Sequence, residues 1–154
     1  MDLTQATLGL AFKKAFYQAV KTLMATGYET EHVYVVFGPP TTYNPEDIVS
    51  FGRVSSGQAA ATMSTNRSRE ETLTLEVVIS CALGGDEDAA LATSERSTEL
   101  LRLIERLVRM DDTTLGGAVR ECVLTSYESE TEVTDEGMAT DIAATFTAKA
   151  RITA

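Results

Sequence analysis

Apolar and polar residues alternate with two different periods along this chain, and each period predicts a different kind of element. Over residues 3–25, apolar positions recur every three or four residues, as on one face of an amphipathic helix. This face comprises Leu8, Phe12, Ala15, Phe16, Ala19, Val20 and Leu23. Asp2 and Gln5 have the spacing of a capping box, and Gly27 fits a left-handed helix stop.

A second helix is predicted from the glycine-containing break at residues 84–88 to about Met110. Asp86, Glu87 and Asp88 at its start complement the positive end of a helix dipole, and arginines gather near its end. Its apolar face comprises Leu100, Leu101, Ile104, Leu107 and Val108. The glycine pairs at 84–85 and 116–117 lack a phosphate-loop pattern and are interpreted as turns.

Strict alternation of apolar and polar residues, or short apolar runs, predict six strands. They cover residues 32–37, 48–51, 59–64, 72–83, 118–128 and 138–152. One apolar and one polar face, clearest at 72–83, are typical of an antiparallel sheet. We therefore expect an α+β fold: a mostly antiparallel β-sheet with two α-helices packed on one face, in the order α-β-β-β-β-α-β-β. One domain is expected over residues 1–154, with an extended loop or hairpin at 52–71 and an acidic hairpin tip at 128–137.

Charge and length exclude several classes of function. The 154 residues include 13 basic and 23 acidic ones, a net charge of −10, which disfavours binding to nucleic acid or to anionic lipid. No apolar run approaches the length of a membrane span, and residues 1–5 do not begin a secretory signal. A soluble protein of a reducing compartment is expected.

Residues suited to catalysis or metal binding are scarce. His32 is the only histidine and has no recognisable triad spacing, so no catalytic residue is assigned. Cys81 and Cys122 lie in apolar runs and are predicted to be buried thiols. No zinc or calcium ligand set is present, and no cofactor is expected. For a small cellular enzyme or ligand-binding module, these three residues would be the first candidates.

Charged loops are the other candidate sites. An acidic hairpin carries Glu128, Glu130, Glu132, Asp135 and Glu136, with no basic residue among them. It is either a solvated loop that prevents edge aggregation, or it forms a repulsive wall around a channel or an electrostatic docking surface. A loop of opposite sign carries Asn66, Arg67, Arg69 and Glu70. In a ring of subunits, such a basic loop would pair with a neighbour's acidic hairpin, so both sets are candidates for a subunit or tube interface.

The order of these elements resembles a known family. A long N-terminal amphipathic helix precedes the strand Val33-Tyr34-Val35-Val36-Phe37, and a polar excursion leads to Leu73-Thr74-Leu75-Glu76-Val77. A helix containing Leu101-Arg102-Leu103-Ile104-Glu105 follows Gly84-Gly85-Asp86. The turn Thr114-Leu115-Gly116-Gly117 precedes a closing hairpin that ends in Thr147-Ala148-Lys149-Ala150-Arg151. Over nearly its whole length the chain resembles the tail terminator (tail-to-head joining) proteins of long-tailed bacteriophages.

The resemblance implies a non-enzymatic structural protein of the virion, located at the phage neck and assembled in the host cytoplasm. Such proteins form a hexameric ring that caps the last ring of tail-tube protein and ends its polymerisation. The ring also offers a surface to the head-side connector or stopper protein, and genomic DNA passes through its lumen without specific binding. The resemblance implies no cofactor and no membrane contact. Another neck subunit, a head-completion or stopper protein, is the alternative within the same class.

Overall fold

The computed structural model describes residues 6–60 and 68–152, and these residues form one five-stranded sheet, two α-helices and a short π-helix. The elements are α1 (Gly9–Thr26), β1 (Tyr34–Val36), β2 (Asp47–Ala60), β3 (Arg69–Gly84), α2 (Glu87–Arg106), the π-helix η1 (Leu107–Asp111), β4 (Glu121–Thr134) and β5 (Gly137–Ile152). The strand order is β1-β2-β3-β5-β4, and only β1 and β2 are parallel. The expected α+β class and the mostly antiparallel sheet are confirmed.

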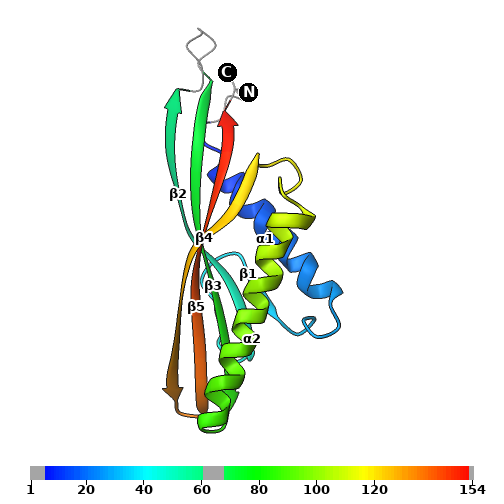
Figure 1. The fold of residues 1–154 in the computed structure, drawn as a ribbon, viewed down its shortest axis with the longest axis vertical. Coiled ribbons are helices and arrows are strands. Elements are labelled where there is room, and N and C mark those ends of the chain that lie inside the picture. Colours follow the sequence, from blue (N-terminus) through cyan, green and yellow to red (C-terminus); the bar gives the residue numbers. More distant parts are fainter. Residues whose placement is uncertain (1–5, 61–67, 153–154) are drawn as a thin grey trace.

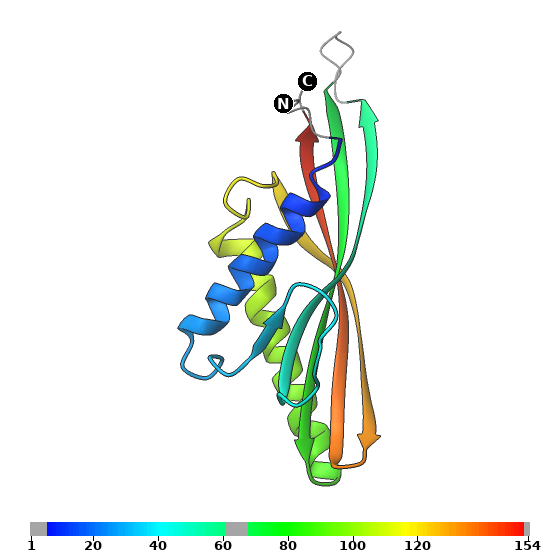
Figure 2. The same ribbon diagram turned by 180° about the vertical axis from the view of Figure 1, so that it is seen from behind.

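Both α-helices cover the same face of the sheet, as the two opposite views show (Figures 1 and 2). Their buried residues meet the inward-facing set of β3 and β5, where every second residue is buried. Phe16 lies at the centre of this contact, with its ring edge-on to Phe51 and Phe146 at centroid distances of 5.5 and 4.9 Å. The other face of the sheet, called the open face below, carries no helix.

One expectation about the strands was wrong. Residues 48–51 and 59–60, predicted as parts of two separate strands, belong to the single strand β2, so the order is α-β-β-β-α-β-β. Residues 61–64 lie outside the described part of the chain. Residues 55–60 have little apolar character, and hydrogen bonding to β3 rather than side-chain pattern keeps them extended.

Two β-bulges lie at the same level of the sheet. β2 shifts register between Phe51 and Val54, and β4 shifts between Leu124 and Ser126. The register through β3 and β5 places the two shifts on the row that contains Glu76. A bulge increases the local twist of a strand. At the level of the two bulges the long strands cross, and the two halves of the sheet diverge on either side of this level (Figure 1).

The first helix begins later than predicted and ends differently. It starts at Gly9 rather than near residue 3, and the proposed cap, Asp2 with Gln5, lies outside the described residues. Gly27 has a φ of −88° and is not a left-handed stop. Instead, the Thr30 hydroxyl donates to the Met24 carbonyl at 2.8 Å and closes the helix end.

The second helix starts where its charges predicted. Asp86 is its N-cap and accepts a hydrogen bond from the Asp88 N–H at 3.4 Å. Its last residues continue as η1, so the α-helix itself ends at Arg106. The N-terminal half packs on the sheet through small residues, and the hydroxyls of Thr93, Thr140 and Thr131 form a chain with distances of 2.8 and 2.7 Å.

Candidate subunit interface

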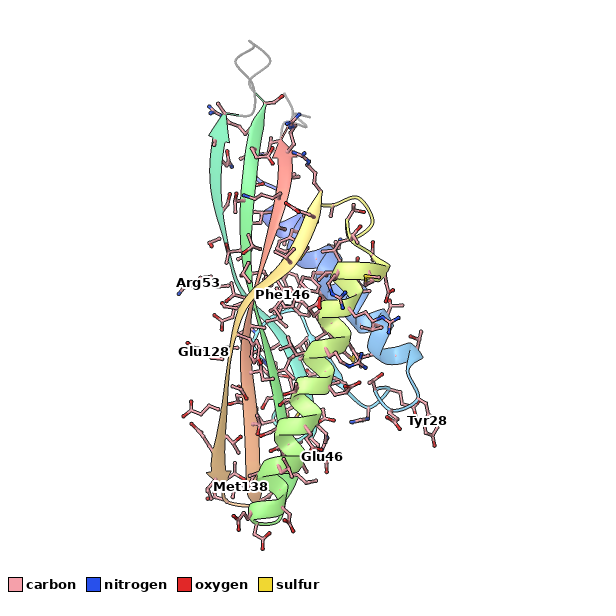
Figure 3. All side chains as sticks on the ribbon, in the orientation of Figure 1. Tyr28, Glu46, Arg53, Glu128, Met138 and Phe146 are labelled. Atoms are coloured by element: carbon pink, nitrogen blue, oxygen red, sulfur yellow. The ribbon has the colours of Figure 1, made fainter. Side chains whose placement is uncertain are left out.

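The acidic residues of the β4–β5 hairpin form a ladder on the open face. After its bulge, β4 directs Glu128, Glu130 and Glu132 to that face, because Thr131 between them bonds to Thr140 on the helix side. Asp135 and Glu136 form the turn, and all five residues are exposed. Figure 3 shows Glu128 projecting away from the helices. None of these carboxylates forms an ion pair with another described residue.

Within this ladder, two carboxylates face each other. Glu130 is directly opposite Asp141 in the antiparallel register of β4 and β5, and both side chains are exposed. Like charges in directly opposed positions destabilise a sheet. The sequence therefore maintains a local electrostatic cost at this point of the surface, which a positively charged partner would relieve.

The other candidate set lies at the opposite end of the sheet. Arg69 begins β3, whereas the acidic turn adjoins the end of that strand, where Gly84 pairs with Gly137. At a rise of about 3.3 Å per residue, the strand separates the two ends by roughly 50 Å. Within one chain the two sets therefore do not meet. Asn66 and Arg67 lie outside the described residues.

Glu70 from that set is already occupied within the chain. Arg120 contacts its carboxylate at 3.0 Å and Arg151 approaches it at 3.7 Å. Arg69 is exposed and forms no ion pair with another described residue. Glu70 therefore ties the start of β4 to the ends of β3 and β5, which is a structural contribution within the chain.

Arg53 is a cationic candidate that sequence reasoning missed. It lies in the β2 bulge, is exposed, and forms no ion pair with any other described residue. Figure 3 shows its side chain projecting from the open face, on the same side as Glu128. No local sequence pattern revealed the bulge, because it arises from the register between β2 and β3.

Both edges of the sheet leave backbone groups available. β4 forms one edge, and β1 covers the other edge only opposite residues 48–50 of β2. No backbone hydrogen bond links the outer side of β4, or of residues 52–60, to another residue in the described ranges. Residues 127–134 and 55–60 are also exposed on both faces of the sheet. Such long exposed edges are templates for pairing with another strand.

The open face also contains a groove of about 710 Å³. One wall is the connection from β1 to β2, with Pro40, Tyr43 and Pro45, and the other is the acidic hairpin. Its floor is formed by short or apolar residues of β2, β3 and β5. Of the predicted acidic residues, Glu132, Asp135 and Glu136 line this groove, whereas Glu128 and Glu130 lie outside its lining.

His32 lies in a polar cluster around a buried carboxylate. Its Nε2 is 2.6 Å from Oδ2 of Asp47, and the Arg96 guanidinium donates to Oδ1 of the same residue. Burial opposes ionisation of Asp47, but the hydrogen bonds from Arg96 and His32 outweigh it and hold its pKa below the ordinary value. This cluster fastens α2 to the start of β2.

The two thiols have the properties of core residues. Both Cys81 and Cys122 are buried and unpaired. Burial raises the pKa of Cys122 to about 12, and burial together with the Asp47 charge raises the pKa of Cys81. Because the thiolate is the nucleophile, neither cysteine offers one at neutral pH. The described residues contain no cluster of potential metal ligands, and no described helix is long and apolar enough to cross a membrane.

No family model and no curated protein matches this chain. Among solved structures, it is similar to a chain from the "Virion of native gene transfer agent (GTA) particle", with a TM-score of 0.45 and 15% sequence identity. The alignment covers 96% of this chain and 99% of that chain. At this TM-score and identity, the likeness by itself assigns neither a family nor a function.

Proposed function

We propose that this chain is a structural subunit of a virion of the long-tailed phage type, acting as a tail terminator. The observation that carries the proposal is one sheet with two different open edges. β4 presents a negative edge with Glu128 and Glu130, whereas the uncovered part of β2 carries Arg53. Two unlike edges pair head to tail, and such contacts close into rings or extend as filaments.

Strand direction is compatible with this mode of assembly. Within the sheet, β4 runs antiparallel to β2, because each step from β2 through β3 and β5 to β4 reverses direction. Rotation about an axis along the strands therefore places β2 of one copy antiparallel to β4 of the next. Main-chain hydrogen bonds would supply affinity in such strand addition, and the side chains would supply specificity.

The order of elements supports the particular role of terminator, since it resembles that family over nearly the whole chain. In this role the subunits form a hexameric ring that caps the tail-tube protein, binds the head-side connector, and lets DNA pass through. The inert thiols and the structural use of Asp47 favour this reading over a small enzyme.

The first test is native mass spectrometry of the full chain with negative-stain imaging, alone and with polymerising tail-tube protein. Rings that bind tube ends and limit tube length are expected. Arg53→Glu and Glu128→Lys should each weaken ring formation, and the double variant should restore part of it. Lys14→Glu, an exposed charge reversal on α1, is the matched control and should leave the rings intact.

Two outcomes would decide against the terminator. A chain that stays monomeric with and without tail-tube protein contradicts the proposal. Rings that bind the head-side connector but ignore tube ends would instead identify a stopper or head-completion protein.

A further inference from the structure

The groove on the open face is a second possible binding site, separate from the two edges of the sheet. We propose that it binds an extended, arginine- or lysine-bearing segment of a second protein. The walls, the floor and the charge of the groove each limit the kind of ligand that fits. The inference does not depend on ring formation, because pairing at the edges of the sheet leaves the open face uncovered.

The floor is hollow because the side chains there are short. Ala82 pairs with Ala139, and Ser80 pairs with Asp141, on neighbouring rows of β3 and β5. Ile48 and Val78 complete an apolar part of the floor. The connection containing Pro40, Tyr43 and Pro45 stands above this floor on one side. A hollow with a wall on each side accommodates an extended chain better than a globular surface.

The charge of the groove is one-sided. Glu46, Glu132, Asp135, Glu136 and Asp141 line it, and no lysine or arginine does. Glu46 alone has a nearby cation, Arg96 at 3.7 Å. Asp141 also faces Glu130 across the strands. A basic side chain in the groove would therefore replace repulsion between carboxylates with attraction.

Ser50 adds a polar group at the floor. The residue is only 9% exposed and lines the groove, and its hydroxyl is not a buried group left without a partner, since the described residues contain none. A hydroxyl at this position can exchange a hydrogen bond with water for one with a ligand group. The main-chain amide or carbonyl of an extended segment supplies such a group.

A different protein fits the groove better than a second copy of this chain. Each copy carries a net charge of −10, so a second copy approaches this surface against repulsion. Two of the described basic side chains of the open face are also engaged, since Arg151 approaches Glu70 and Lys149 donates to Thr72 at 2.9 Å, and the proposed ring contact uses the third, Arg53. A basic partner segment meets neither obstacle.

Fluorescence anisotropy of the full chain with a labelled octapeptide that alternates arginine and valine tests the proposal. An octapeptide alternating glutamate and valine is the control probe and should not bind. Glu132→Gln, in the groove, should weaken binding about fivefold, whereas Glu128→Gln, outside its lining, should change it less than about twofold. Ala139→Phe fills the floor without changing the charge and should abolish binding.

Circular dichroism and urea unfolding check that each variant is folded, and Ser80→Leu fills the same floor if Ala139→Phe is unstable. Equal losses in the Glu128 and Glu132 variants, with binding retained in Ala139→Phe, would mean diffuse attraction to an acidic surface and would overturn the proposal. Loss of self-association in Ala139→Phe would show that a second copy occupies the groove and would also overturn it.

Discussion

The backbone N–H of Leu8 donates a hydrogen bond of 2.7 Å to Oε1 of Glu71, so a carboxylate from β3 holds the start of α1. The hydroxyls of Thr7 and Ser56 donate to the other oxygen, Oε2. Glu71 is fully buried and forms no ion pair with any residue in the described ranges. Neutral donors alone satisfy this anion, and together they join the first helix to the β2–β3 hairpin.

Glu71→Gln is expected to lower the free energy of unfolding by about 1–3 kcal/mol. The amide group of glutamine would direct its own donor at Thr7 or Ser56 and leave a buried polar group unsatisfied. Urea unfolding followed by circular dichroism measures the change. Glu70→Gln, on the adjacent but partly exposed residue, should cost less than about 1 kcal/mol. Equal effects of the two changes would show that the buried network contributes nothing special.

Stability should fall as the solution is acidified. Burial opposes ionisation of Asp47 and Glu71, but their hydrogen bonds outweigh it and hold both pKa values below the reference values of 3.8 and 4.5. The unfolded chain therefore takes up these protons first. The stabilisation is complete above about pH 4.5 and is lost as the pH falls through the lower native pKa values.

Unfolding free energies measured between about pH 6 and pH 2 check this expectation. Asp47→Asn and Glu71→Gln should each flatten the acid limb, and the double variant should flatten it most. Glu128→Gln, at an exposed position, is the control and should follow the wild type. An acid limb that is unchanged in the double variant would contradict the assignment.

Gly137→Ala should be strongly destabilising. Gly137 has a φ of +156°, and a Cβ there would lie 2.2 Å from the Leu83 carbonyl oxygen and 2.7 Å from Cα of Gly84. Because these contacts are backbone, relief requires movement of the hairpin, and a cost above about 2 kcal/mol is expected. Gly57→Ala, where a Cβ meets nothing within 4 Å, is the matched control and should be neutral or slightly stabilising. Thermal unfolding compares the two, and similar melting temperatures would refute the prediction.

Both cysteines should resist labelling in the native state. Their thiols are buried, and burial raises the pKa of Cys122 to about 12. A disulfide reagent at neutral pH should therefore react at least about a hundredfold more slowly with native protein than with urea-unfolded protein. Rapid native labelling of one thiol would reveal an exposed or activated cysteine. The enzyme interpretation would then need to be reconsidered.

Periodicity was sufficient to predict most of the core. The apolar face that contains Phe16 and the alternation that contains Phe146 both point inward as expected, and the two rings meet. The apolar–polar pattern was a weaker guide where strand pairing, and not burial of side chains, determines the backbone conformation. Residues 55–60 are extended because β3 pairs with them, although they are exposed on both faces.

Contacts between distant segments account for the parts of the site that were missed. Asp47 was not among the candidate site residues, yet it meets His32 and Arg96 from other elements. The acidic residues were expected in a hairpin tip at 128–137, but β4 continues to Thr134, so only Asp135 and Glu136 lie in the turn. The exposure of Arg53 depends on a bulge. The groove requires the register of three strands, because its short floor residues are far apart along the chain.

The carboxylates of β4 also determine which strands this edge tolerates. Pairing of β4 with the same strand of another copy would bring two sets of Glu128 and Glu130 together, beside Asp141 of each copy. We therefore expect pairing of β4 with a second β4 to be disfavoured at low ionic strength, although β4 is a long strand with an unpaired edge. Salt shortens the range of this repulsion, so concentrated salt should bring copies together as amorphous aggregates rather than ordered assemblies.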